Sequence, residues 1–204
     1  MQSKVLSKQT LLLTVVLSGL VLSIALLLYF IPKSSIQGRS ASVIENIVAL
    51  QKQEQTSVGL PVRLKIPMIG VDSAIIPVGL TFDGAMDVPK GPVNVAWFNL
   101  GPRPGEIGSA VVAGHYGWKN NIPAVFDNLH KLRKGDKIYI EDEKGGNIIF
   151  VVREIQIYGK NADASLVFGS SDGKAHLNLI TCTGVWNKTE KSRSDRLIVF
   201  TDKE

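Results

Sequence analysis

The sequence has 204 residues, of which 45% are hydrophobic and 20% are charged. Its formal net charge of +5 is mild and is not concentrated in a basic run, which argues against nucleic-acid binding. A single cysteine, Cys182, cannot form an intramolecular disulfide, so no disulfide framework holds the fold together.

The first element in the chain is an apolar run. Residues 10–31 contain no charged side chain, and as an α-helix they would be about 33 Å long, enough to cross a bilayer core of about 30 Å. Only a weak cleavage site, Ser-Ala-Ser at 40–42, follows the run, so we predict an uncleaved transmembrane signal anchor. Lys4 and Lys8 slightly favour a cytoplasmic tail of residues 1–9, with the rest of the chain extracellular.

The polar segment that follows reads as a stalk. Residues 32–59 are rich in Ser, Gln and charged side chains, and within them 42–55 could form a short amphipathic helix. We predict an extracytoplasmic stalk that carries the next domain away from the membrane.

From residue 60 onward, short runs rich in β-branched residues alternate with Gly, Pro, Asn and Asp clusters. The runs are 62–69, 73–79, 109–115, 137–142, 147–158, 176–182 and 196–201. This pattern predicts one all-β domain over residues 60–204, either a barrel or a sandwich. Val125, Phe126, Leu129 and Leu132 have helical spacing, which predicts one short helix or turn of helix within 123–132.

Cys182 ends the run 176–182, where the ordinary role of a lone cysteine is that of a small buried hydrophobe. A nucleophilic cysteine needs a histidine nearby, because the thiolate is the attacking form. His176 is on the same predicted strand, about 20 Å away, and His130 is most simply a surface residue of the predicted helix. His115 ends the run 109–115, so it can face Cys182 at a barrel rim.

An arginine near the cysteine could stabilise the oxyanion that forms when a thiolate attacks a carbonyl, because guanidinium keeps its charge and offers five donors. Arg196 begins the run 196–201, and Arg193 lies three residues earlier. We favour Arg196 because it lies at the predicted strand edge. The long loop predicted from Thr183 to Asp195 keeps Arg193 as the alternative.

Several motifs make residues 60–202 resemble the sortase family, the cysteine transpeptidases of Gram-positive cell surfaces. SAVVAGH, which ends at His115, resembles the strand leading to the catalytic histidine of that family. LITC, which ends at Cys182, resembles the family signature TLxTC, except that Asn178 stands where threonine is common. RLIV resembles the start of the last strand, whose catalytic arginine falls on Arg196.

The resemblance implies an eight-stranded sortase-type β-barrel with one or two short helices, preceded by the transmembrane helix. The Cys182 thiolate would attack an LPxTG-like sorting signal after its threonine, His115 would protonate the leaving amine, and Arg196 would hold the oxyanion. An amine acceptor, such as a peptidoglycan precursor or a pilin lysine, would then resolve the thioacyl intermediate. No cofactor is implied.

Four residues beside these groups are candidates for substrate binding: Ala113, Ile180, Thr181 and Trp186. A plain role in the barrel core or as a loop cover is the alternative for each of them.

Other functions are weighed by the same motifs. Some sortases bind calcium, but the spacing of Glu106, Asp127 and Glu154 makes no recognisable calcium loop, so we expect no metal. Papain-like wall hydrolases place cysteine before histidine, and the Ser-His-Gly-Cys signature of L,D-transpeptidases is absent. The alternative from another class is a catalytically idle, membrane-anchored β-domain that binds surface proteins, with Cys182 buried and unreactive.

Overall fold

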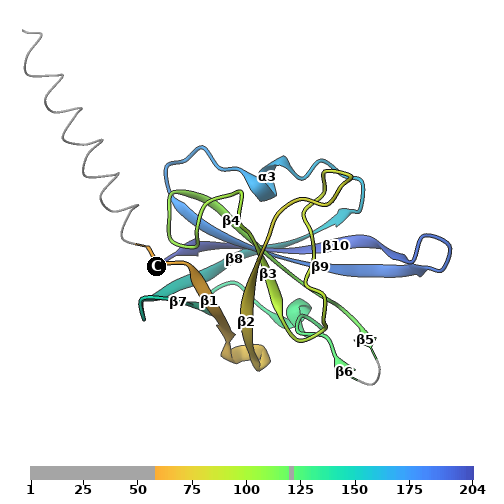
Figure 1. The fold of residues 1–204 in the computed structure, drawn as a ribbon, viewed down its shortest axis with the longest axis horizontal. Helices are drawn as coiled ribbons and strands as arrows, with labels where there is room; N and C mark the ends of the chain where they lie inside the picture. Colours follow the sequence, from red (N-terminus) through yellow and green to blue (C-terminus); the bar gives the residue numbers. More distant parts are fainter. Residues whose placement is uncertain (1–57, 120–121) are drawn as a thin grey trace, which may run out of the picture. The chain divides into compact units, whose positions relative to one another are not determined.

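The structure is a computed structural model that describes residues 58–119 and 122–204, all of them within the unit Leu50–Glu204 (Figure 1). The predicted membrane span at 10–31 and nearly all of the predicted stalk lie outside the described residues. Within the described ranges, no helix is both long and apolar enough to cross a bilayer.

Eight strands close into a barrel in the order β1-β2-β3-β4-β9-β10-β8-β7, which confirms the all-β barrel expected from the sequence. The pairs β2–β3 and β4–β9 are parallel, and the other neighbours are antiparallel. The strands are β1 (Pro61–Ile66), β2 (Val71–Val78), β3 (Val95–Phe98), β4 (Gly108–Gly114), β7 (Lys137–Asp142), β8 (Asn147–Gly159), β9 (Ala175–Asn187) and β10 (Ser192–Lys203). A separate two-stranded sheet joins β5 (Trp118–Lys119) and β6 (Ile122–Pro123).

The short helix or turn of helix predicted within 123–132 is present as a 3-10 turn, η2 (Leu129–Lys131). The side chains of Phe126, Leu129 and Leu132 are buried. Phe126 N–H donates to the His115 carbonyl at 3.1 Å, so the segment folds back against the end of β4 instead of forming an independent helix. The short helices that exist elsewhere are η1 (Pro67–Ile69) and α3 (Ser165–Phe168).

The strands bury two different faces. Leu177 and Leu179 of β9 point into the barrel interior, where they join the main core with Phe150. Ile180, on the opposite face of β9, packs against an outer cluster formed by Val111, Val167, Ile198 and Phe200. This alternation follows from the two-residue period of a strand, and it places Cys182 on the same outer face as Ile180.

A buried carboxylate holds the start of β1 against the β7–β8 turn. Asp142 is 7% exposed and accepts three backbone N–H bonds, from Gly59 at 3.1 Å, Lys144 at 2.9 Å and Gly146 at 2.7 Å. Burial alone would raise the pKa of Asp142, but these N–H donors more than offset it, so the pKa lies below its usual value. The ionised carboxylate therefore stabilises the fold.

Replacing Asp142 with alanine is expected to lower the free energy of unfolding by about 3 kcal/mol at pH 7, because three backbone donors lose their acceptor. The lower folded pKa means that this stability is present above the unfolded pKa of about 3.9 and is lost as the pH falls through the folded value. Urea unfolding of the full-length protein in mild detergent tests this, with Asp83→Ala, an exposed carboxylate, as the control. A difference between wild type and Asp142→Ala that does not shrink at low pH would contradict it.

Candidate active site

Cys182 lies inside a strand, not at its end. β9 continues to Asn187 and β10 begins at Ser192, so most of the loop predicted from 183 to 195 is a two-stranded hairpin that extends the barrel sheet. Cys182 is half-buried, and its partner directly across the β9–β10 ladder is Arg196. The register of the β9–β10 ladder therefore places the Arg196 side chain next to that of Cys182.

His115 is the first residue after β4, at the same end of the sheet as Cys182. β4 and β9 pair in parallel up to the rung Ala113–Ile180, so His115 and Cys182, each two residues beyond that rung, follow at the same end of the pairing. The His115 Nε2–H donates to the Pro89 carbonyl at 2.7 Å, because a carbonyl oxygen can only accept. In the neutral ring Nδ1 is then the nitrogen that can accept a proton.

The link between the two strands is a buried hydrogen bond. The Thr181 hydroxyl donates to the Gly114 carbonyl at 2.8 Å, which joins the residue before Cys182 to the residue before His115. Thr181 is 3% exposed, shares the inner face with Leu179 and lines neither of the two cavities that Cys182 lines. The hydrogen bond is its visible role, and its part in substrate binding stays a prediction.

An apolar cavity of about 610 Å³ begins at Cys182. Two of the predicted substrate-binding residues, Ala113 and Ile180, line it, and so does Arg196. The remaining wall is largely apolar and comes from the segment between β2 and β3, from β3, from α3 and from β10. It includes Leu80, Met86, Val88, Phe98, Phe168 and Ile198.

A second cavity, of about 660 Å³, also includes Cys182 in its lining. We call it the polar cavity because His115 and charged side chains, among them Arg193, line it beside the predicted residue Trp186 and Tyr116. The cysteine and the histidine share this space, and Cys182 lines both cavities.

The family model for the Sortase domain matches residues 64–204, which is most of the chain. The chain belongs to the sortase family. This assignment agrees with the eight-stranded all-β barrel.

Solved structures similar to this sortase are also sortases. Sortase C-1 from Actinomyces oris (formerly Actinomyces naeslundii) is 26% identical with a TM-score of 0.56, over 71% of this chain and 74% of that chain. The complex of Streptococcus agalactiae sortase C1 and MTSET is 26% identical with a TM-score of 0.54, over 70% and 66%. A Clostridium perfringens sortase D5 transpeptidase is 25% identical with a TM-score of 0.53, over 76% and 88%. Comparison with curated proteins found no match.

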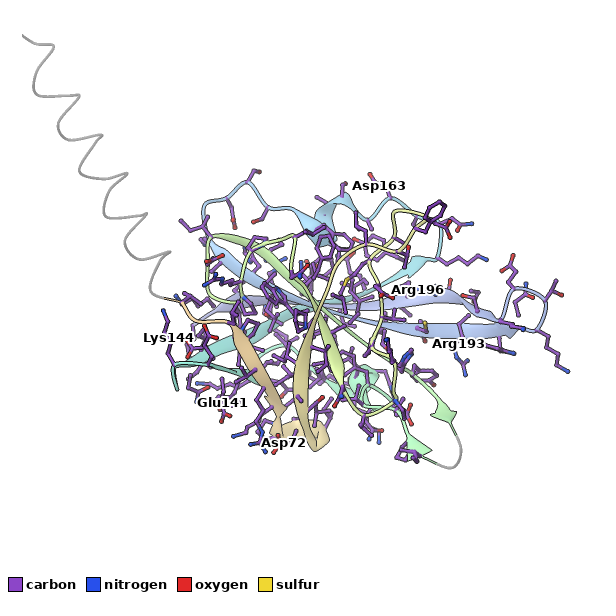
Figure 2. All side chains as sticks on the ribbon, in the orientation of Figure 1. Asp72, Glu141, Lys144, Asp163, Arg193 and Arg196 are labelled. Atoms are coloured by element: carbon purple, nitrogen blue, oxygen red, sulfur yellow. The ribbon has the colours of Figure 1, made fainter. Side chains whose placement is uncertain are left out.

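The two arginines of this sortase have different surroundings (Figure 2). Arg196 donates from Nη1 to the Asp195 carbonyl at 2.9 Å and to the Arg193 carbonyl at 3.1 Å, which holds its guanidinium beside the Cys182 rung. Arg193 lies over the Tyr116 ring, 4.7 Å from its centroid, and donates to the Gly184 carbonyl at 2.8 Å. Arg196 therefore adjoins the thiol, whereas Arg193 joins the hairpin to the segment after His115.

The histidines set aside in the sequence have structural surroundings. His176 is buried, with Nδ1 at 2.8 Å from Asp202 and Nε2 at 3.0 Å from Asp172. Hydrogen bonding to His176 is the main reason that the pKa of Asp172 lies below its usual value. His130 is exposed on η2.

Asn178, which replaces the usual threonine of the sortase signature, has a structural contact. Its Nδ2–H donates to the Val167 carbonyl at 2.7 Å, which ties α3 to β9 beside the apolar cavity. The residue that departs from the signature therefore holds part of the cavity wall in this chain.

The acidic residues considered for calcium make separate local contacts. Asp127 accepts from Gly117 N–H at 2.6 Å, Glu106 accepts from Arg103 N–H at 2.8 Å, and Glu154 pairs with Arg153. In the part of the chain that the structure describes, no group of His, Cys, Asp and Glu side chains is arranged to hold a metal ion.

Proposed function

We propose that this sortase is a membrane-anchored cysteine transpeptidase of the cell surface, with residues 10–31 as its anchor and the barrel outside the membrane. It cleaves an LPxTG-like sorting signal between the threonine and the next residue, and transfers the protein to an amine acceptor of the cell wall or of a pilin. The observation that carries the proposal is the position of Cys182, opposite Arg196 on the ladder and in one cavity with His115.

The first half of the reaction forms a thioester. The Cys182 thiolate attacks the threonine carbonyl carbon, and the carbonyl oxygen becomes an oxyanion that the Arg196 guanidinium stabilises. Protonated His115 gives its proton to the leaving nitrogen as the peptide bond breaks. The products are a thioacyl enzyme and a free amine at the start of the released peptide.

The second half runs in the opposite direction. An acceptor amine attacks the thioester carbon, the carbon–sulfur bond breaks, and Cys182 leaves as a thiolate. The proton that the nitrogen loses goes to His115, which restores the starting state. The transferred protein ends in a new amide bond.

The two cavities divide the substrates between them. The apolar cavity suits the leucine and proline of a sorting signal, because its wall is mainly aliphatic and aromatic. It leads to Cys182 beside Arg196, so a peptide bound there would present its threonine carbonyl to both groups. The polar cavity that contains His115 is left for the leaving amine and the acceptor.

The test is formation of the thioacyl enzyme. We expect full-length protein in mild detergent to cleave members of a fluorogenic LPxTG-type peptide library. Intact-mass measurement should show an adduct of the peptide up to its threonine on wild type and none on Cys182→Ala.

Thiol labelling at neutral pH separates the proposal from the catalytically idle surface-protein binder. A reactive Cys182 in the folded protein supports the enzyme. Cleavage by Cys182→Ala equal to that of wild type, or an inert Cys182 without any peptide cleavage, would overturn the proposal.

A further inference from the structure

The polar cavity beside Cys182 has a one-sided charge. Lys90, Lys191 and Arg193 line it together with His115, and no carboxylate is among its lining residues in the described part of the chain. Asp127, the acidic group behind Gly117, is directed at that residue's N–H, 2.6 Å from its Oδ1. The cavity that faces the histidine is therefore positively charged.

The cations come from two segments that the fold places on either side of the site. Lys90 directly follows Pro89, whose carbonyl accepts the hydrogen bond of His115. Lys191 lies in the turn of the β9–β10 hairpin with a φ of 47°, and Arg193 is fixed by Tyr116 and by the Gly184 carbonyl. Three cations, Lys90, Lys191 and Arg193, thus line the cavity that contains the histidine.

A positive cavity is a poor place for a simple amine. An acceptor amine arrives mostly as an ammonium ion at neutral pH, because amines of this kind have pKa values of about 8 to 10. Three nearby cations repel an acceptor with a net positive charge, and attract one that carries a negative group close to the amine. The apolar cavity contains a lysine too, Lys160, but that side chain pairs with Glu190.

We propose that the positive cavity is the acceptor subsite and that it selects an amine with an anionic group, a carboxylate or a phosphate, close to the reacting nitrogen. This inference rests on the proposed function and names its acceptor class. Lys90 and Lys191 hold the anionic group, while the nitrogen lone pair forms the amide bond, the carbon–sulfur bond breaks to release the Cys182 thiolate, and the nitrogen's proton passes to His115. A lysine side chain within a protein, with no such group beside its amine, is disfavoured.

The test measures how the thioacyl enzyme divides between hydrolysis and aminolysis. The acceptors are two matched pairs, glycine with glycinamide and phosphoethanolamine with ethanolamine, and Nα-acetyl-lysine amide as a cationic amine. The aminolysis rates of the two members of each pair are measured with wild type and with a Lys90→Gln/Lys191→Gln variant. The intrinsic reactivity of each amine is the same with both proteins, so it cancels when the two preferences are compared. Lys131→Gln/Lys134→Gln, exposed and outside the cavity lining, is the control with the same change in net charge.

We expect the preference for the anionic member of a pair to fall about 10-fold in Lys90→Gln/Lys191→Gln and to stay unchanged in the control. The pair with the larger fall distinguishes a carboxylate from a phosphate. An unchanged preference, or aminolysis led by Nα-acetyl-lysine amide in wild type, would overturn the inference alone. Absence of any thioacyl adduct would overturn the proposed function, and this inference with it.

Discussion

Replacing Arg196 with glutamine is expected to lower kcat/KM for cleavage of a sorting-signal peptide by about 1,000-fold. Arg196 is the ladder partner of Cys182, so in the proposed reaction its guanidinium is the charge next to the carbonyl that the thiolate attacks. A charged, planar donor fixed before the reaction stabilises the oxyanion without reorganising, and glutamine offers neither the charge nor the fork of donors. Peptide cleavage kinetics would measure the effect.

Arg193→Gln is the matched control, because it removes the same charge from the same strand. Its kcat/KM is expected to fall about 10-fold, because the hairpin would hold the Tyr116 segment less firmly. Oxyanion stabilisation is expected to stay intact. Urea unfolding of both variants should match that of wild type, which shows that the fold is intact. A larger loss for Arg193→Gln than for Arg196→Gln would assign the oxyanion role to Arg193.

Adding one methyl group at Gly114 is expected to lower the free energy of unfolding by about 3 kcal/mol. A Cβ at this position would lie 2.4 Å from Cδ2 of Phe126, and 2.8 and 2.9 Å from two more atoms of that ring. The ring is fully buried, so it cannot move aside without disturbing the core. His115 is the next residue along the chain, so we also expect peptide cleavage to fall at temperatures where the variant stays folded.

Urea unfolding of Gly114→Ala, Phe126→Leu and the double variant would separate the clash from other effects. Leucine leaves space where the ring stood, so the double variant should lose less stability than the sum of the single changes. Gly159→Ala is the control, because a Cβ there meets nothing within 4 Å, and its stability should change by less than about 0.5 kcal/mol. Additive losses would show that the contact with Phe126 is not the cause.

The sequence predicted the longer apolar strands and missed β3 and the outer half of the β9–β10 hairpin. β3, with the sequence Val-Ala-Trp-Phe, is buried on both faces and too short to alternate. The outer half of the β9–β10 hairpin was missed because its residues are mostly exposed. Its polar sequence around Lys188 therefore resembles that of a loop. The apolar spacing of 123–132 reflects burial against the barrel, because packing overrides local helical preference at such sites.

The sequence was sufficient to select individual candidate residues of the site. Strand position and reach singled out Cys182 and His115, which the structure brings into one cavity, and their catalytic roles stay predictions. The choice between Arg196 and Arg193 depends on strand register, and a register shift between Arg193 and Asp195 changes the simple alternation of faces. Pro89 was not foreseeable, because its contact with His115 joins segments 26 positions apart that share no local pattern.

The hydrogen bond between Thr181 and Gly114 joins positions 67 apart in the chain. Pairings over such a distance close a long loop before they gain contacts, so we expect β4 and β9 to join late as the protein folds. Cys182 and His115 approach each other only through that pairing. A chain that has not completed its barrel therefore carries a cysteine without a basic partner. In the proposed reaction, completion of the barrel therefore sets when this thiol becomes able to attack a peptide.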